Sequence, residues 1–377
     1  MQLGADALEK SDFKILQGRK VVIITNQTGL TADGRSVVDL LFHAPGVKLV
    51  AILSPEHGFR GDAEAGAKVA DTTDKETGLP IHSLYGDTTR PTAKMLEGAD
   101  TIVFDMQDIG TRFYTYISTM GQAMEEAAAH KMKFVVLDRP NPIRGDRVEG
   151  DILDSDIKRM TGYFEIPVRH GLTIGELAHW VNKTRGLKVD LDVVRMKNWK
   201  RSLWFNETGL DFVPPSPNIP RVTTALLYSG IGCFEATNVS VGRGTDTPFE
   251  VIGAPWMNGK ALAAYLRERN FPGAVFEETT FRPGKDVYAG QDCQGVQIIV
   301  TDRNTISPFD IFVAAFLYLE ENQKEAFKPV WEEVRVVTGS NRLKEAAEGG
   351  WRLEDLLAYY RDRSAEFARS VAPFLLY

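Results

Sequence analysis

The sequence lacks a long hydrophobic run and has very little cysteine. No apolar stretch approaches the ~20 residues that span a bilayer, so the sequence predicts no transmembrane helix. Two cysteines, Cys233 and Cys293, occur among the 377 residues. They do not define a redox compartment, and we expect two buried free thiols rather than a disulfide.

A secretory signal is also missing, because no apolar segment follows residues 1–6. Two interpretations of location stay open. The protein is either cytoplasmic, or extracytoplasmic (periplasmic or secreted) with its export signal already removed.

Several cofactor and nucleophile motifs are absent. The first predicted strand leads into Thr25-Asn26-Gln27-Thr28-Gly29 rather than G-x-G-x-x-G, which disfavours a dinucleotide. The segment Gly242-Arg243-Gly244 lacks the Lys and Ser/Thr of a P-loop, and no G-x-S-x-G elbow occurs. No known metal-ligand spacing is present, so we predict neither cofactor nor metal. A metal held by His57 and nearby aspartates remains an alternative.

The charge distribution disfavours nucleic acid as a partner. The net charge is −7, and the 44 basic residues are scattered rather than clustered. A local basic pocket for an anionic ligand remains compatible with this pattern. Hydrophobic residues make up 43% and charged residues 25%, an ordinary composition for a soluble chain long enough for two domains.

The first half of the chain alternates strand-like and helix-like segments. Continuous apolar runs predict strands that are buried on both faces, and the helices between them predict right-handed crossovers. The pattern therefore indicates an α/β fold with a doubly wound, mostly parallel sheet. The predicted strands are residues 21–25, 48–53, 101–105 and 134–138, and the predicted helices are residues 36–43, 118–130 and 173–185.

A proline-dense stretch, residues 214–220, interrupts the alternation and suits a domain junction or a cleft wall. Further elements are predicted after it. The expected helices are residues 221–228, 259–270, 308–320 and 353–369, and the expected strands are residues 274–278 and 295–300.

Polar side chains follow all four predicted strands of the first half. Because parallel strands end at one edge of a sheet, we expect these side chains to share an active-site rim. The four segments are residues 26–29, 54–61, 105–116 and 138–142.

The rim is rich in carboxylates, which suits glycosidic bond cleavage by one protonated carboxyl and a second group. Glu56 lies beside Pro55 and Phe59, a poorly solvated setting that favours the raised pKa of a general acid. For any single aspartate, a helix cap or an arginine partner is at least as good an explanation.

Other rim residues suit substrate binding. The guanidinium groups of Arg60, Arg112, Arg139 and Arg169 can bind an anionic group. The aromatic residues Tyr114, Tyr116 and Trp256 can stack on a sugar, although a place in the hydrophobic core is the more common role of such residues. His57 can tune Glu56 or contact substrate, or it can be structural.

Taken together, these motifs resemble the NamZ-type family of exo-β-N-acetylmuramidases, formerly a domain of unknown function. One departure is Ala236, which stands where the family's Glu-Gly-Thr-Asn segment has glycine. The matching stretches are residues 25–28, 54–61, 105–116, 137–142, 169–173, 215–220 and 235–256.

The resemblance implies a Rossmann-like N-terminal domain over residues 1–225, a smaller α/β domain over residues 226–377, and a cleft between them. It implies release of terminal N-acetylmuramic acid from the non-reducing end of peptidoglycan fragments, with a sugar or muropeptide as the partner. Family members are commonly exported. The competing hypotheses are a non-catalytic sugar- or muropeptide-binding protein and a metal-dependent hydrolase.

On this interpretation Glu56 is the general acid, and either Asp108 or Glu235 is the second catalytic group. Stereochemistry and oligomeric state stay open. The residues expected to bind substrate are Asn26, His57, Arg60, Asp105, Arg112, Tyr114, Tyr116, Asp138, Arg139, Asn141, Arg169, His170, Asn218, Asn238 and Arg243.

Overall fold

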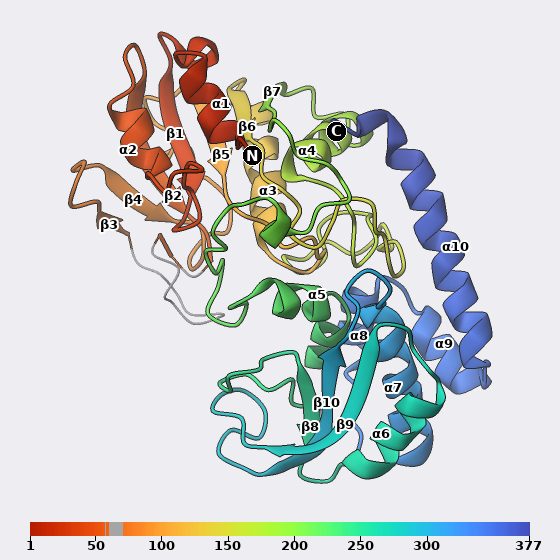
Figure 1. Ribbon diagram of the computed structural model, residues 1–377. Helices are drawn as coiled ribbons and strands as arrows, with labels where there is room; N and C mark the ends of the chain where they lie inside the picture. Colours follow the sequence, from red (N-terminus) through yellow and green to blue (C-terminus); the bar gives the residue numbers. More distant parts are fainter. Residues whose placement is uncertain (57, 60–70) are drawn as a thin grey trace.

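A seven-stranded sheet forms the centre of the N-terminal unit, which we define as residues 1–213. The fold is that of a computed structural model, which describes residues 1–56, 58–59 and 71–377 (Figure 1). The strand order is β3-β4-β2-β1-β5-β6-β7, and all neighbours are parallel except β3 and β4. The strands are β1 (Lys20–Thr25), β2 (Lys48–Ser54), β3 (Thr72–Thr73), β4 (Pro80–Ser83), β5 (Thr101–Asp105), β6 (Lys133–Leu137) and β7 (Asp190–Val194).

Helices cover both faces of this sheet, which explains the continuous apolar runs. In β1, Val22 and Ile24 pack into one core with α3 and α4, while Val21 and Ile23 pack into another with α1 and α2. The predicted doubly wound α/β architecture is therefore confirmed. The helices are α1 (Gly4–Lys10), α2 (Val37–Phe42), α3 (Tyr116–Ala129) and α4 (Ile174–Thr184), with the 3-10 turns η1 (Lys14–Leu16) and η2 (Phe205–Glu207).

The sheet reverses direction between β1 and β5. From β1 the chain builds outward through β2 to β4, then returns to the other side of β1 and builds outward through β5, β6 and β7. In open α/β sheets, ligands bind outside the carboxyl ends of the strands near such a reversal. The ends of β1, β2, β5 and β6 carry the polar segments that the sequence singled out.

The C-terminal unit, which begins at α5, contains a three-stranded antiparallel sheet of order β8-β10-β9. One large hydrophobic core continues from this unit into the α3–α4 face of the N-terminal unit. The elements are α5 (Val222–Ile231), η3 (Gly232–Ala236), β8 (Val251–Ala254), α6 (Gly259–Glu268), β9 (Ala274–Phe281), β10 (Cys293–Val300), α7 (Pro308–Asn322), α8 (Trp331–Thr338), α9 (Arg342–Gly349), α10 (Leu353–Val371) and η4 (Ala372–Phe374).

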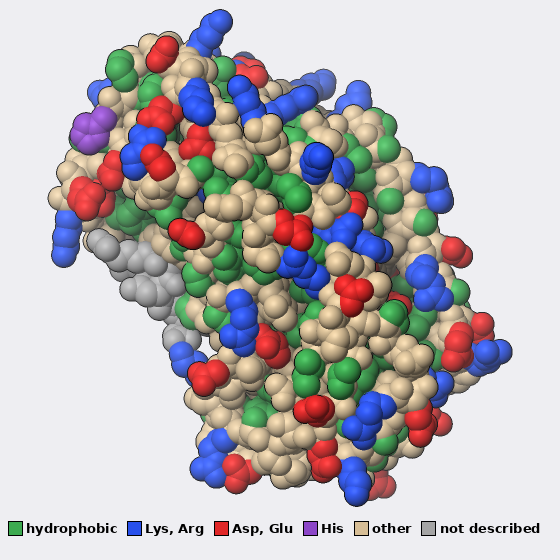
Figure 2. All heavy atoms as spheres, viewed as in Figure 1, with side chains coloured by type: hydrophobic (Ala, Val, Ile, Leu, Met, Phe, Trp, Pro, Cys, Tyr) green, Lys and Arg blue, Asp and Glu red, His purple; other side chains and the backbone are tan. Residues whose placement is uncertain are grey.

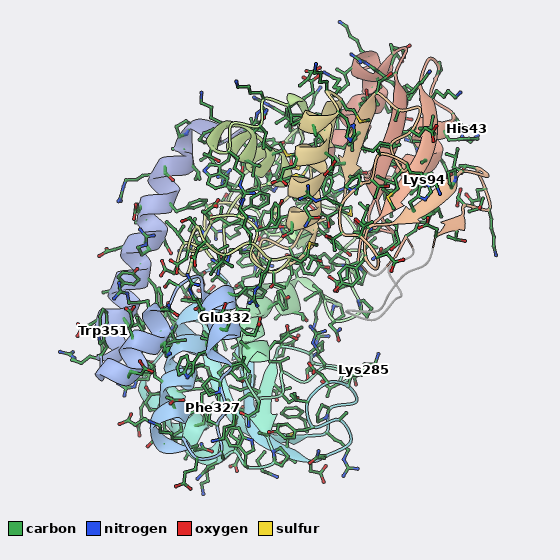
Figure 3. All side chains as sticks on the ribbon, turned by 180° about the vertical axis from the view of Figure 1, so that it is seen from behind. His43, Lys94, Lys285, Phe327, Glu332 and Trp351 are labelled. Carbon is green, nitrogen blue, oxygen red and sulfur yellow. The ribbon has the colours of Figure 1, made fainter. Side chains whose placement is uncertain are left out.

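The C-terminal helix connects the two units. Helix α10 runs along the outer side of the molecule from the C-terminal unit back to the N-terminal unit (Figures 1 and 3). There the Tyr377 hydroxyl donates to Oδ2 of Asp138 at 2.6 Å, and the Leu376 amide donates to Oε1 of Glu176 at 2.9 Å. The end of the chain thus docks beside the start of α4.

The structure shows the state of the two cysteines, the hydropathy of the helices and the distribution of surface charge. Cys233 and Cys293 are free and buried, as predicted. Among the described residues, no helix is both long and apolar enough to cross a membrane. Charges of both signs are interspersed over the face seen in Figure 2.

Candidate active site

A cleft of about 140 Å³ lies between the two units, with walls from both. It is bounded by the ends of β2 and β5, by the proline-dense segment, and by α5 and η3 with the loop after η3. Its lining residues are Glu56, Phe113, Tyr114, Thr115, Thr161, Ser216, Asn218, Ile219, Tyr228, Glu235, Arg243 and Phe249.

Glu56 enters this cleft from the N-terminal unit, directly after β2. The residue is 9% exposed, and its Oε2 accepts the Thr115 hydroxyl at 2.6 Å. Burial, and then the charge of Glu56, raise the pKa of the neighbouring Tyr85 to about 12. The Tyr85 phenol therefore keeps its proton near neutral pH, and the Thr115 hydroxyl restrains the orientation of the carboxyl.

Glu235 and Arg243 form an ion pair on the opposite wall. The Arg243 Nε–H donates to Oε1 of Glu235, and the guanidinium lies 5.2 Å from the ring centroid of Phe249. Burial raises the pKa of Glu235, and Arg243 opposes that shift by favouring the charged form. Although burial disfavours the charge on Arg243, Glu235 raises its pKa. Since the Glu235 side chain is 25% exposed, it is open to a ligand in the cleft.

The two carboxyl groups belong to one electrostatic environment. The charge of Glu56 adds to the rise in the pKa of Glu235. Burial and then Glu235 raise the pKa of Tyr228, with a further contribution from Glu56. Glu56 of the N-terminal unit and Glu235 of the C-terminal unit thus line the same cleft as Tyr228.

Aromatic rings form the floor between these walls. Tyr228 makes edge-on contacts with Phe113 at 5.0 Å, Phe249 at 4.7 Å and Tyr114 at 6.1 Å between ring centroids. Such a surface suits the apolar face of a sugar ring. Of the predicted site residues, the cleft brings together Glu56, Tyr114, Asn218, Glu235 and Arg243.

Asp108 does not line this cleft, and its expected catalytic role is corrected. It is 5% exposed, its Oδ2 accepts the Gly110 amide at 2.7 Å, and the same oxygen lies 3.3 Å from Nε2 of His170. His170 is equally buried, and its Nδ1 accepts the Leu172 amide at 3.1 Å. The pair is enclosed behind the rim, so neither residue is placed to contact substrate.

Asn26 and Tyr116 also form hydrogen bonds to other parts of the protein. The Asn26 amide donates to the Tyr116 hydroxyl at 2.9 Å, and that hydroxyl donates to the Pro215 carbonyl at 2.7 Å. The side-chain carbonyl of Asn26 accepts a hydrogen bond from the Thr28 backbone amide at 3.0 Å. Both residues are buried, and they hold the proline-dense segment against the end of β1 instead of binding a sugar.

The charged residues after β5 and β6 also have internal partners. Arg139 forms a two-pronged ion pair with Asp105, at 2.5 and 2.9 Å. Burial raises the pKa of Asp105, and Arg139 opposes the shift. Asp138 accepts the Gly175 amide at the start of α4 and the Tyr377 hydroxyl. Asp105 and Asp138 therefore stabilise the fold and do not reach the cleft.

The same correction applies to Asn141 and Arg169. The Asn141 amide donates to the Leu172 carbonyl at 3.0 Å. The buried Arg169 pairs with Glu149 and donates to the Ile143 carbonyl. Both residues fix long loops of the N-terminal unit.

Arg112 and Asn238 complete the corrections. Arg112 is fully buried and donates to four backbone carbonyls, two of them in α8. Asn238 donates to the Ala326 carbonyl at 2.9 Å and accepts the Lys328 amide at 2.7 Å. Two further predicted residues, His57 and Arg60, lie outside the described residues.

Several cleft residues escaped the sequence analysis. Thr115 lies within a segment that was singled out, but a threonine there is indistinguishable from a helix cap. Tyr228 is hidden in the apolar run of α5, and Ser216 in the proline-dense stretch.

The described part of the chain holds no group of three His, Cys, Asp or Glu side chains close enough to bind a metal ion. The carboxyl groups of the cleft instead have hydroxyl and guanidinium partners, as described above.

Comparisons with known proteins match the whole length of the chain. Residues 21–223 match the family model described as "Exo-beta-N-acetylmuramidase NamZ, N-terminal", and residues 226–377 match the corresponding C-terminal model. The peptidoglycan β-N-acetylmuramidase NamZ of Bacillus subtilis (strain 168) is 40% identical over 100% of this chain and 91% of its own length.

Two crystal structures of DUF1343 family proteins from Bacteroides fragilis NCTC 9343 are also similar. One superposes with a TM-score of 0.92 at 36% identity, and the other with a TM-score of 0.79 at 30% identity. Each comparison covers 100% of this chain and 98% of the other.

Proposed function

Because the chain belongs to the NamZ family of exo-β-N-acetylmuramidases, we propose that it is a glycosidase that releases N-acetylmuramic acid from the non-reducing ends of peptidoglycan fragments. The observation that carries this proposal is the placement of Glu56 and Glu235 on opposite walls of one cleft. Most glycosidases use two such groups, one to protonate the leaving oxygen and one to act at the anomeric carbon or on water.

We assign the proton donor to Glu56. The Thr115 hydroxyl donates to Oε2 of Glu56 and restrains the carboxyl, which lines the cleft where we place the leaving oxygen. Arg243 favours the charged form of Glu235 against the rise in pKa that burial causes. We assign Glu235 the second role, on the other face of the sugar, either on water or on the anomeric carbon.

Arg243 also supports recognition of an acidic sugar. Its Nε is used by Glu235, and among the described residues its two terminal nitrogens have no hydrogen-bond partner. They are placed to bind the lactyl carboxylate of N-acetylmuramic acid. The ring of Tyr228 lies below the same cavity and can support the apolar face of the sugar.

A chromogenic N-acetyl-β-muramide tests the proposal. We expect the wild type to release the chromophore, and both Glu56→Gln and Glu235→Gln to lose roughly 10²–10⁴-fold in kcat. Glu278→Gln, at an exposed position of β9, is the matched control and should keep full activity. If Glu56 is the acid, residual activity of Glu56→Gln should no longer fall on the alkaline side of the pH profile.

Three outcomes would contradict this mechanism. Tight muropeptide binding without hydrolysis by the wild type would indicate a binding protein. Loss of activity on exhaustive chelation would indicate a metal-dependent hydrolase. Near wild-type turnover by Glu56→Gln would remove Glu56 from the role of proton donor.

A further inference from the structure

A second cavity, of about 380 Å³, opens at the carboxyl edge of the sheet where the strand order reverses between β1 and β5. We call it the switch-point crevice. It shares no lining residue with the catalytic cleft. Its floor contains Gln107 after β5 and Arg139 after β6, residues of the polar strand ends that the proposed catalytic mechanism does not use.

The floor of the crevice presents one hydrogen-bond donor and one acceptor. Arg139 uses Nε and Nη2 for Asp105 and the Leu30 carbonyl, while Gln107 uses Nε2 for two backbone carbonyls. Within the described residues, Nη1 of Arg139 and Oε1 of Gln107 have no protein partner, and neither atom is sealed from solvent. The two side chains are only 5% and 4% exposed, so these atoms face the crevice that they line.

The charges around the crevice favour a neutral ligand. Asp105 neutralises Arg139 through two hydrogen bonds. Asp33 at the mouth is paired with Arg35 at 2.9 Å, and Asp211 adds a further carboxylate to the lining. An anionic ligand would therefore meet no uncompensated positive charge.

The shape and the polar pair together specify an amide. The apolar part of the remaining lining includes Leu30, Phe205, Leu210 and Val213. A secondary amide offers a carbonyl to Arg139 and an N–H to Gln107, with its methyl group against these walls.

We propose that the switch-point crevice binds the acetamido group of a neutral N-acetylhexosamine. The choice of N-acetylglucosamine among such sugars rests on the proposed function, since it is the uncharged sugar of peptidoglycan. Each of the two cavities then binds a different sugar of peptidoglycan. The cleft with Arg243 takes the acidic sugar, and the crevice takes the neutral one.

One segment connects the two cavities. Leu210, Asp211 and Val213 line the crevice, whereas Ser216, Asn218 and Ile219 line the cleft. Between them, the Gln27 amide donates to the carbonyls of the two intervening prolines at 2.9 and 3.1 Å. A sugar in the crevice therefore packs against the same short segment that forms a wall of the cleft.

Ligand-observed NMR with free N-acetylglucosamine on the Glu56→Gln protein tests this proposal without turnover. We expect saturation transfer to be strongest at the acetyl methyl group. Glucose, a neutral sugar that lacks the acetamido group, should bind at least about tenfold more weakly because it cannot make the two amide hydrogen bonds to Arg139 and Gln107. N-acetylmuramic acid should compete poorly for the crevice.

Variants that fill the crevice test whether N-acetylglucosamine binds there. Ala32→Trp at the mouth and Leu210→Trp on the wall should each abolish the N-acetylglucosamine signal, and Ala358→Trp on the exposed side of α10 should not. Unchanged binding in both crevice variants, or equal binding of glucose, would overturn the proposal. Hydrolysis by the wild type is measured separately, so absence of hydrolysis with intact crevice binding would contradict only the proposed function.

Discussion

Replacement of Arg112 by methionine tests whether this arginine holds the two units together instead of binding substrate. Its guanidinium donates to the carbonyls of Asp151 at 2.8 Å, Ile166 at 2.7 Å, Val336 at 3.3 Å and Val337 at 2.8 Å. The first two belong to loops of the N-terminal unit and the last two to α8 of the C-terminal unit. A single side chain therefore crosslinks both units.

The loss of stability expected for Arg112→Met can be worked out from these four hydrogen bonds. Burial lowers the pKa of Arg112 to about 10, which shows that its charge is costly to enclose, and the carbonyl dipoles offset that cost. A hydrogen bond to a charged group contributes roughly 1.5–3 kcal/mol, but removal of the charge also removes its desolvation penalty. We expect Arg112→Met to lower the free energy of unfolding by about 3–5 kcal/mol, because four carbonyls lose a buried donor.

Urea denaturation followed by tryptophan fluorescence measures this change as a shift in the midpoint. Arg243→Met is the matched control, since it removes an arginine that faces the cleft. That variant should lose hydrolysis, and its urea midpoint should shift less than that of Arg112→Met, because the Glu235 carboxyl that loses its partner is 25% exposed and can be hydrated. Arg112→Lys should be intermediate, because an ammonium group can satisfy only some of the carbonyls.

The opposite pattern would refute the reasoning. If Arg112→Met unfolds at the wild-type urea concentration and loses only substrate affinity, Arg112 contacts the substrate and the contacts with α8 contribute little.

Two further predictions concern the packing of the units. Tyr377→Phe removes the hydroxyl that donates to Asp138 and accepts the Met196 amide, so stability should fall by about 1–3 kcal/mol in urea denaturation at pH 7. Burial raises the pKa of Asp138 to about 6 from 3.8, so the free energy of unfolding should fall as the pH rises through this window. The Tyr377 hydroxyl opposes that rise in pKa, so in Tyr377→Phe the fall should extend to higher pH. A pH profile of stability that does not shift would contradict this role of Tyr377. Gly230→Ala would place a methyl carbon 2.1 Å from the Pro308 backbone and should force α5 away from α7. We expect this change to lower the free energy of unfolding by about 1–3 kcal/mol or more. An unchanged melting temperature would contradict this close approach.

Much of the fold follows from local sequence patterns. The predicted strands at 21–25, 48–53, 101–105 and 134–138 each match an observed strand to within one residue at either end, since a strand covered on both faces must be continuously apolar. The helix predicted over residues 173–185 is observed as α4, which begins after its cap residue Thr173. By contrast, β7 is an edge strand with alternating aspartates, and β3 and β4 are short, so no apolar run marked them.

The sequence by itself placed polar residues at the strand ends and identified Glu56 as a candidate, because residue type and its position after a buried strand are local properties. Glu235 and Arg243 became candidates through the family resemblance. Only the tertiary structure decided which of the charged groups face a ligand. Arg112, Arg139 and Arg243 are chemically alike, yet one holds backbone carbonyls, one holds a buried carboxylate and one faces the cleft. That difference depends on contacts between segments far apart in the chain, which the C-terminal unit supplies when it packs against the sheet edge.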